Sequence, residues 1–362
     1  MVFDAVRAIC VIIVYFANML DLAPITRHLR AKASSHLLVT AVHHFNIFEM
    51  LAGTSRSMAD IQKITGLADR PAMVLLPALC AMQLLQRDKA GNYSPTELGR
   101  FLTHNTYGNL VGYTALEKND AGVIQMRDWL LNDGPQEGSA GLSYVMESDV
   151  PSPMDEPESA RFFTMALAGR ARYLSPLAAS AMPAREAHLL DIAGGTGYYT
   201  FEWLRLNIAS TATILDRPEV LAVAREFLED WITIYPEHSD VASRITWLAA
   251  DMLSDEFPPA DIILTASMFH DWPVSTCREL TYKIAGALQK GGELWVHDAF
   301  LNDDLDGPLS VTDYSAMLFL GTKGRAYSRA EMRGWFADAG LINRELSVPT
   351  LLDYSLISAV KQ

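Results

Sequence analysis

The chain has 362 residues, of which 50% are hydrophobic and 20% are charged. This composition excludes a disordered or collagen-like chain, and the length predicts two or three domains. The 29 basic and 43 acidic side chains give a net charge of −14, which makes nucleic acid a poor partner because its binding depends on Lys and Arg displacing counterions. The three cysteines, Cys10, Cys80 and Cys277, lie far apart. Their spacing excludes a disulfide framework and a CxxC motif and fits a reducing cytosol.

Residues 8–20 form a nearly unbroken apolar run, too short for the ~20 residues of a membrane-spanning helix. Asp4 precedes the run, Asp21 follows it and no small-residue cleavage site closes it, which disfavours a signal peptide. We therefore expect a buried or subunit-interface helix in a cytoplasmic protein. A targeting segment is the alternative.

The predicted N-terminal domain covers residues 1–105. Apolar residues at helical spacing predict a helix over 36–51. A capping box that starts at Ser57 predicts a short helix, and a second helix follows over 69–85. Residues 84–93 predict a hairpin that turns over 88–92, and Ser94 opens a further capping box.

Two helices and a hairpin in this order predict a winged helix. In the second helix, residues 69–85, Arg70 is the only basic side chain, too few to contact phosphates or guanine edges. The broad apolar face of this helix suits burial. We therefore interpret the domain as a dimerisation or packing module, with DNA binding as the alternative.

Residues 106–183 form the predicted helical bridge, with turn-rich stretches at 133–141 and 149–157 and a helix over 158–181. From residue 184 to 362 short apolar strands alternate with helices. This alternation predicts an α/β domain with a parallel, doubly wound sheet. The predicted strands cover 188–192, 211–215, 245–249, 261–265 and 293–296, with two more between 343 and 360; helices cover 218–231, 276–288 and 329–339.

A glycine-rich turn follows the first of these strands. The strand ends at Asp191, and Gly194, Gly195 and Gly197 follow; glycine supplies the dihedral freedom and the close backbone approach that a ligand-binding turn needs. In a dinucleotide fingerprint the third position would be Thr200, neither Gly nor Ala, which disfavours NAD. Asp191 would repel a pyrophosphate and could bind an ammonium group.

Acidic residues also follow the next two strands. Asp216 ends the second strand, where a carboxylate can accept both hydroxyls of a ribose. Asp251 and Met252 follow the third strand, in reach of an adenine ring. Together these residues suit S-adenosylmethionine, which is cationic at sulfur and has no phosphate. The alternative is a set of strand-end acids that share no ligand.

With these motifs the chain, from about residue 36 to its end, resembles the small-molecule O-methyltransferases of the caffeate and hydroxyneurosporene type. The resemblance implies a winged-helix dimerisation domain joined to a Rossmann-like class I methyltransferase domain, a homodimer, and S-adenosylmethionine as cofactor. The matching segments are DIAGGTG (191–197), LDRPEV (215–220), AADML (249–253), MFHDWP (268–273) and GRAYSRAEM (324–332).

The resemblance also implies a catalytic pair. His270 matches the general base of the family, and Asp298 aligns with a glutamate that orients this base. A phenol with a pKa near ~10 needs such a base before its oxygen can attack a methyl group. Two positions depart from the family pattern, because Gly324 stands where a second glutamate is expected and Ala193 replaces the first loop glycine.

Aromatic and apolar side chains, Phe163 and Met268 among them, predict a flat, mostly apolar acceptor such as a phenol, although core packing is the better explanation for most of them. Arg170 could hold a carboxylate. The two His-Asp pairs, at 270–271 and 297–298, do not form a recognised ligand motif, so we expect no metal. The candidate pocket residues are Phe162, Met165, Phe269, Trp272, Asp313 and Met317.

The sequence therefore predicts a cytoplasmic, homodimeric O-methyltransferase that acts on a small hydroxylated metabolite, as in secondary metabolism, with no nucleic acid or membrane as partner. Three alternatives remain. The first is an enzyme of the same fold that keeps the cofactor but catalyses hydroxylation or a pericyclic step. The second is a C- or N-methyltransferase, and the third is a winged-helix regulator.

Overall fold

The computed structural model describes residues 20–135 and 152–362. By its contacts the chain divides into two compact units. We call Met1–Leu22, Tyr144–Ala299 and Met332–Gln362 the sheet unit, and Ala23–Ser143 with Phe300–Glu331 the helical unit. Except for Leu20, the apolar run at 8–20 lies outside the described residues.

This division differs from the predicted boundaries of 1–105, 106–183 and 184–362. Residues 300–331, expected in the C-terminal domain, belong to the helical unit, and the end of the predicted bridge belongs to the sheet unit. The first difference has a packing cause. Ala316 and Phe319 of α12 (Leu309–Gly321) are fully buried in the same apolar cluster as Leu75 of α5 (Asp69–Ala81).

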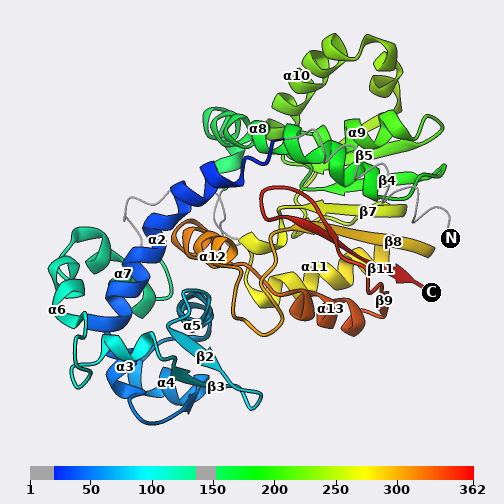
Figure 1. The fold of residues 1–362 in the computed structure, drawn as a ribbon. Helices are drawn as coiled ribbons and strands as arrows, with labels where there is room; N and C mark the ends of the chain where they lie inside the picture. The colour runs from blue at the N-terminus through cyan, green and yellow to red at the C-terminus, as the bar shows by residue number, and fades with distance from the viewer. Residues whose placement is uncertain (1–19, 136–151) are drawn as a thin grey trace. The chain divides into compact units, whose positions relative to one another are not determined.

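The described part of the sheet unit contains one mixed sheet in the order β10-β11-β8-β7-β4-β5-β6, with β9 paired to β11 (Figure 1). The five predicted strands are confirmed and run parallel, whereas β11 runs antiparallel to β8. The strands are β4 (His188–Ile192), β5 (Thr211–Asp216), β6 (Ile245–Ala249), β7 (Ala260–Ala266), β8 (Leu288–Asp298), β9 (Leu341–Asn343), β10 (Val348–Pro349) and β11 (Ser355–Lys361).

Helices connect these strands, and the predicted helices of this region are confirmed within a few residues. Because β4 pairs with β5 on one side and β7 on the other, the chain reverses its direction of winding at β4. The carboxyl ends at such a switch point are where open α/β sheets bind ligands. The helices are α8 (Pro157–Ala181), α9 (Tyr198–Leu206), α10 (Pro218–Ile234), α11 (Val274–Ala287) and α13 (Arg329–Asp338), with short 3₁₀ turns η3 (Pro153–Asp155), η4 (Pro236–Arg244) and η5 (Phe269–Asp271).

The helical unit begins with α2 (Ala23–His43), which starts earlier and ends sooner than the predicted helix at 36–51. Asn46, in the left-handed region at φ 51°, separates α2 from the short α3 (Ile47–Met50). Ser57 is the N-cap of α4 (Met58–Thr65), as the predicted helix start requires: its hydroxyl accepts a hydrogen bond from the Asp60 amide at 3.2 Å and donates to the Asp60 carboxylate at 2.7 Å. The unit also contains α6 (Val111–Thr114), η2 (Ala115–Glu117) and α7 (Ala121–Leu131).

The predicted hairpin is confirmed as β2 (Leu85–Arg87) and β3 (Asn92–Pro95), and β1 (Arg56–Ser57) pairs with β3. The capping box predicted at Ser94 is wrong, because Ser94 lies within β3. The Thr96 hydroxyl, two residues further on, accepts a hydrogen bond from the Gly99 amide at 3.0 Å, where η1 (Gly99–Leu102) begins.

The expected burial of the predicted helix at 69–85 is confirmed, since nine residues of α5 are buried. Its Arg70 is engaged inside the unit. The guanidinium donates to Asp133 and to the Thr322 carbonyl, each at 2.8 Å, and lies 4.6 Å from the Phe319 ring centroid. Arg70 thus joins α5 to the end of α12.

No single helix in the two described ranges has the length and hydropathy needed to cross a membrane; α4 and α5 reach them only together, with a bend of 114° between them. Among the same residues no group of three or more His, Cys, Asp or Glu side chains is placed to hold a metal ion.

Candidate functional site

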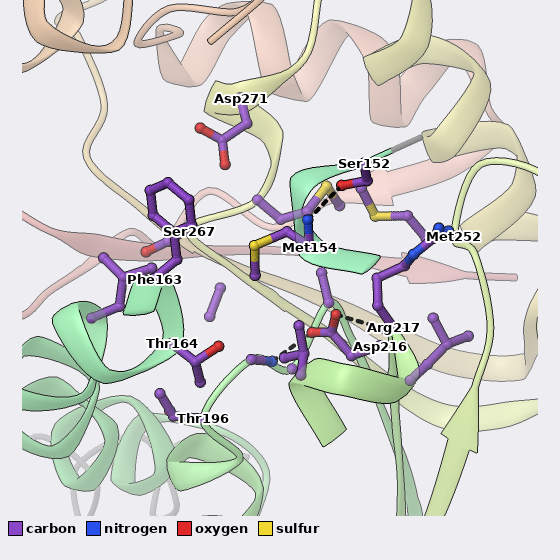
Figure 2. A pocket seen from close by; sticks show the side chains of 18 of the residues that line it. Ser152, Met154, Phe163, Thr164, Thr196, Asp216, Arg217, Met252, Ser267 and Asp271 are labelled. Atoms are coloured by element: carbon purple, nitrogen blue, oxygen red, sulfur yellow. Dashed lines mark hydrogen bonds between the residues drawn. The ribbon is translucent and has the colours of Figure 1, made fainter. Parts of the chain in front are cut away.

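A cavity of about 510 Å³ opens in the sheet unit at the carboxyl ends of β4, β5, β6 and β7 (Figure 2). η3, α8, α9, α10 and η5 contribute the other walls. The residues that line it are Ser152, Met154, Asp155, Phe163, Thr164, Leu167, Arg170, Ala171, Ala193, Gly194, Gly195, Thr196, Tyr199, Leu215, Asp216, Arg217, Val220, Ala250, Asp251, Met252, Leu253, Ala266, Ser267, Met268, Asp271 and Trp272.

The glycine loop shapes one wall of this cavity. A Cβ atom on Gly194 would lie 2.7 Å from the Ile214 side chain, and Gly195 has a φ of +55° that disfavours other residues. Both glycines line the cavity. Gly197 is instead the N-cap of α9 at φ +77° and is not among the lining residues. Its contribution is the turn that starts the helix.

Asp216, at the end of β5, binds the backbone of the glycine loop. Its carboxylate accepts hydrogen bonds from the Gly195 amide at 2.8 Å and the Arg217 amide at 2.7 Å. Burial, which outweighs these bonds, raises the pKa of Asp216 to about 6. The loop amide that would point at a phosphate in a dinucleotide site is therefore already bound to a carboxylate.

Asp191 lies behind the loop. Its buried carboxylate accepts a hydrogen bond from the Thr200 hydroxyl at 2.7 Å, and burial raises its pKa to about 7. Asp191 is not among the residues that line the cavity, because its carboxylate faces the start of α9. The predicted contact of Asp191 with an ammonium group thus stays a prediction.

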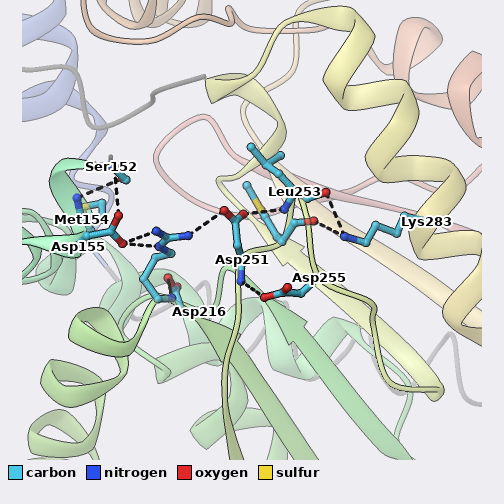
Figure 3. Close-up of polar contacts among 10 residues, drawn as sticks. Ser152, Met154, Asp155, Asp216, Asp251, Leu253, Asp255 and Lys283 are labelled. Carbon is cyan, nitrogen blue, oxygen red and sulfur yellow. Dashed lines mark hydrogen bonds and ion pairs between the residues drawn. The ribbon is translucent and has the colours of Figure 1, made fainter. Parts of the chain in front are cut away.

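Asp251 and Met252 follow β6 and line the cavity as expected. The Asp251 carboxylate accepts from the Leu253 amide and from Arg217, each at 2.8 Å (Figure 3). Lys283 of α11 donates to the carbonyls of Met252 at 2.8 Å and Leu253 at 3.3 Å. These contacts fix the loop after β6.

The charges around the cavity favour a cationic ligand. Its lining contains four carboxyl groups and two guanidinium groups, and the Gly195 amide is bound to Asp216. An S-adenosyl group, with a positive sulfonium, ribose hydroxyls and an amine but no phosphate, fits these acceptors. A pyrophosphate does not fit, because it would meet carboxylates where it needs N–H donors.

The predicted catalytic pair forms beside this cavity. His270, on η5, has its Nδ1 2.6 Å from the Asp298 carboxylate at the end of β8, and both residues are buried. A carboxylate only accepts, so Nδ1 carries the proton and Nε2 is the nitrogen that can take one. Burial lowers the pKa of His270, but the nearby carboxylates Asp298 and Asp271 outweigh it and raise this pKa above its usual value.

His270 lies behind the cavity wall and is not itself a lining residue, whereas its neighbours Asp271 and Trp272 are. Its Nε2 is 3.6 Å from the Asp271 carboxylate. Of the other His-Asp pair, Asp298 joins this group through His270, whereas His297 does not. His297 contacts the Tyr199 hydroxyl at 3.0 Å, and burial lowers its pKa to about 3, so it is neutral.

The predicted pocket residues are only partly brought together. On α8, Phe163 and Leu167 line the cavity, whereas Phe162 and Met165 are 60% and 49% exposed and do not. Residues four apart share a helix face, so Phe163 and Leu167 reach the cavity from one side of α8, and Phe162 and Met165 lie outside its lining.

Phe269 is also a correction, because it is buried and does not line the cavity; its ring centroid lies 6.4 Å from that of Trp335. Trp272 lines the cavity as expected. Asp313 and Met317 belong to α12 in the helical unit, where Asp313 is buried and Met317 is 42% exposed. Their roles stay predictions.

Several lining residues were not anticipated. Arg217 belongs to the LDRPEV motif, which gives its charge but does not indicate the residues with which it forms ion pairs. Asp155 and Met154 lie in a stretch interpreted only as turn-rich. Tyr199 follows the glycine loop at the start of α9. The proline of the motif signals a helix start, which is the one available clue that Arg217 lies at a strand-to-helix edge.

Comparison with known proteins identifies the family. A family model described as an O-methyltransferase domain matches residues 172–342. The chain is 27% identical over 307 residues to 3-hydroxy-5-methyl-1-naphthoate 3-O-methyltransferase of Streptomyces sahachiroi, covering 83% of this chain and 84% of that one. It is 28% identical to mouse acetylserotonin O-methyltransferase, covering 84% and 79%.

A solved structure gives the strongest match among these. An O-methyltransferase family 2 protein from Planctomyces limnophilus, crystallised with apigenin, is 35% identical, has a TM-score of 0.82, and is matched over 95% of this chain and 97% of its own. The expected Rossmann-like methyltransferase fold is confirmed. The chain belongs to the O-methyltransferase family, whose members are S-adenosylmethionine-dependent methyltransferases.

Proposed function

We propose that this protein transfers a methyl group from S-adenosylmethionine to a hydroxyl of a small aromatic metabolite, with His270 as the general base. The observation that carries the base assignment is the buried His270–Asp298 pair, whose Nδ1 to carboxylate distance is 2.6 Å, beside the cavity. The aromatic acceptor is supported by the relatives, since their names include a hydroxynaphthoate and acetylserotonin and the solved relative holds apigenin.

When bound, the cofactor supplies a methyl carbon made electrophilic by the positive sulfur. The Asp216 carboxylate would accept from the ribose hydroxyls, and Asp251 with Met252 would border the adenine. His270 Nε2 takes the proton of the acceptor hydroxyl as its oxygen attacks. Asp298 keeps Nδ1 protonated and stabilises the positive charge that the imidazole gains.

The proton then leaves Nε2 for water, so that the base is restored and S-adenosylhomocysteine and the methyl ether are the products. The raised pKa of His270 suits this step, because a stronger base takes a phenolic proton more readily. The apolar side chains Phe163, Leu167 and Met268 in the cavity wall favour a flat acceptor with few charges.

His270→Gln tests the base. We expect a loss of about 100-fold or more in kcat, while the Kd for S-adenosylhomocysteine stays within about twofold of the wild-type value, because the residues proposed to hold the cofactor, Asp216, Asp251 and Met252, are unchanged. His188→Gln is the matched control, since His188 lies at the opposite end of β4 and should keep its activity.

The acceptors are 3-hydroxy-2-naphthoic acid and apigenin, and the readout is a mass gain of one methyl group with ether formation confirmed by NMR. Full activity of the His270→Gln variant would contradict the base assignment. Methylation at carbon or nitrogen would contradict O-methylation.

We also propose that the protein is a homodimer formed through the helical unit. Tyr107, Tyr113 and Leu116 of this unit are 100%, 73% and 76% exposed, and exposed apolar groups of this kind mark interaction surfaces. Sedimentation velocity at micromolar concentration should show a dimer, and Leu116→Glu should shift it toward monomer. A wild-type monomer would contradict this proposal.

The compartment we propose is the cytoplasm. Cys80 and Cys277 are buried and not disulfide-bonded, which suits a reducing environment. Fractionation of cells that express the tagged protein tests this, and recovery outside the cytoplasmic fraction would contradict it.

A further inference from the structure

Arg217 joins two walls of the cavity through ion pairs with Asp155 and Asp251, the two carboxylates labelled on either side of it in Figure 3. It lies at the N-cap of α10. Its Nη1 donates to Asp251, which follows β6, at 2.8 Å. On its other side Nε donates to Asp155, the last residue of η3, at 2.7 Å, and Nη2 also contacts that carboxylate. One guanidinium therefore ties a loop at the sheet edge to a turn that precedes α8.

The turn that Arg217 holds covers the cavity. η3 has a reciprocal capping box, in which Asp155 accepts from the Ser152 amide at 3.1 Å and the Ser152 hydroxyl accepts from the Met154 amide at 3.2 Å. The turn is therefore a small ordered unit. Met154 lines the cavity from this turn (Figure 2), so that whatever holds η3 also holds Met154 over the site.

The loop after β6, which contains Asp251, also depends on Arg217. The Asp251 carboxylate is fixed by two donors, the Leu253 amide and Arg217. Without Arg217 the carboxylate keeps, among the residues that the structure describes, the Leu253 amide as its donor and can rotate away from the cavity. The orientation in which Asp251 can accept from a ligand therefore depends on Arg217.

The positive charge of Arg217 in the cavity wall would by itself repel a cationic ligand. Its two carboxylate partners neutralise this charge, and the cavity lining contains more carboxyl than guanidinium groups. The three side chains are 28–35% exposed. Ion pairs this exposed contribute about 1 kcal/mol or less to stability, so they can open at each turnover.

We propose that Arg217 is a positioning residue of the cofactor site: it orients Asp251 and holds η3, so that Met154 covers the bound cofactor until the Asp155–Arg217 ion pair opens. The proposal rests on S-adenosylmethionine occupying the cavity, and it is independent of the acceptor and of His270. It makes opening of this ion pair a step in the release of S-adenosylhomocysteine.

The test is the dissociation rate of S-adenosylhomocysteine, followed in a stopped-flow instrument by intrinsic tryptophan fluorescence, since Trp272 lines the cavity. Asp155→Asn and Arg217→Met should both release the ligand about fivefold faster or more, and Arg217→Met should also raise the Kd through Asp251. Arg161→Met is the matched control, because it removes the exposed Arg161–Glu226 ion pair between α8 and α10, outside the cavity lining.

Salt gives a second readout that a merely structural role would not produce. Raising the ionic strength screens exposed ion pairs, so it should speed release from the wild type and the Arg161→Met variant more than from Asp155→Asn, which keeps the Arg217–Asp251 pair but has lost the pair that holds η3. A wild-type release rate in Asp155→Asn would overturn the proposal.

Because Asp155→Asn keeps the Arg217–Asp251 pair, it remains informative if Arg217→Met does not fold. No acceptor is needed in this experiment. It can therefore fail while methylation by His270 is intact, and loss of methylation would leave its result unchanged.

Discussion

Replacement of Asp298 by Asn tests how strongly the Asp298 carboxylate affects the pKa and the reactivity of His270. The carboxylate lies 2.6 Å from His270 Nδ1, and both side chains are buried, at 5% and 2% exposed. Asn removes the charge but keeps the size. Hydrogen bonds to charged groups contribute about 1.5–3 kcal/mol, and the upper end applies to a pair this short and buried. A loss of about 3 kcal/mol corresponds to about 100-fold in kcat/KM.

The pH dependence adds a signed prediction. His270 must be neutral at Nε2 to act as a base, so the activity of the wild type should rise with pH through a pKa above 6.5, the usual value for histidine. Burial lowers this pKa, and among the groups that raise it the Asp298 carboxylate has the strongest effect. In Asp298→Asn the acid limb of the profile should therefore move to lower pH, while its plateau falls.

The assay is the initial rate of methyl transfer between pH 5 and 9, with the cofactor saturating. Thermal unfolding of the variant serves as the control for folding. An acid limb that stays in place or moves to higher pH would refute the reasoning, and so would a plateau that falls less than threefold.

Three further predictions address the cavity. Ala193→Gly should change the free energy of unfolding by no more than about 0.5 kcal/mol, because Ala193 has a φ of 54° and the ~1 kcal/mol of strain it loses is offset by the greater entropy of unfolded glycine; urea denaturation checks this, and a loss above 1.5 kcal/mol would contradict it. S-adenosylhomocysteine should release a fraction of a proton on binding near pH 6, because the pKa of Asp216 is about 6 without ligand and bonds to its ionised form lower that value; calorimetry in buffers of different ionisation enthalpy measures it, and proton uptake would contradict it. Phe163→Ala should raise the KM for a naphthol acceptor more than Phe162→Ala, because only Phe163 lines the cavity; equal effects in steady-state kinetics would contradict the assignment of the α8 face.

Much of the sheet was predictable because its strands are short buried runs. β4 and β6 match the predicted ranges, 188–192 and 245–249, at both ends. The acids at strand ends were also predictable, since parallel strands bring their carboxyl ends to one edge. Asp216 and Asp251 meet at the cavity for this reason. Asp191 was the exception, because the sequence does not say on which side of the glycine loop a carboxylate lies.

The other features of the site depend on contacts between residues that are distant in sequence. Arg217 pairs with Asp155 and Asp251, which are 62 and 34 residues away, and no local pattern encodes such pairs. On α8 the apolar residues lie on more than one side, with Leu174 and Leu177 buried and Phe162 exposed. Apolarity alone therefore could not identify the face toward the cavity.

The placement of α12 in the helical unit had no sequence signal either. Its neighbours in the core, α2 and α5, lie more than 200 residues earlier in the chain. The helix is apolar along most of its length, so that its composition fits either unit. Only the packing of Ala316 and Phe319 decides the assignment.

The central claim is that the cavity lined by the glycine loop binds a cationic S-adenosyl cofactor. The Gly195 amide of this loop is already hydrogen-bonded to the Asp216 carboxylate, so it does not point at a phosphate. Isothermal calorimetry of the purified protein with S-adenosylmethionine, S-adenosylhomocysteine and NADH tests it directly. We predict that both S-adenosyl compounds bind, that NADH gives no heat of binding, and that Asp216→Asn raises the Kd of both S-adenosyl compounds. Saturable binding of NADH with no binding of either S-adenosyl compound would contradict the account.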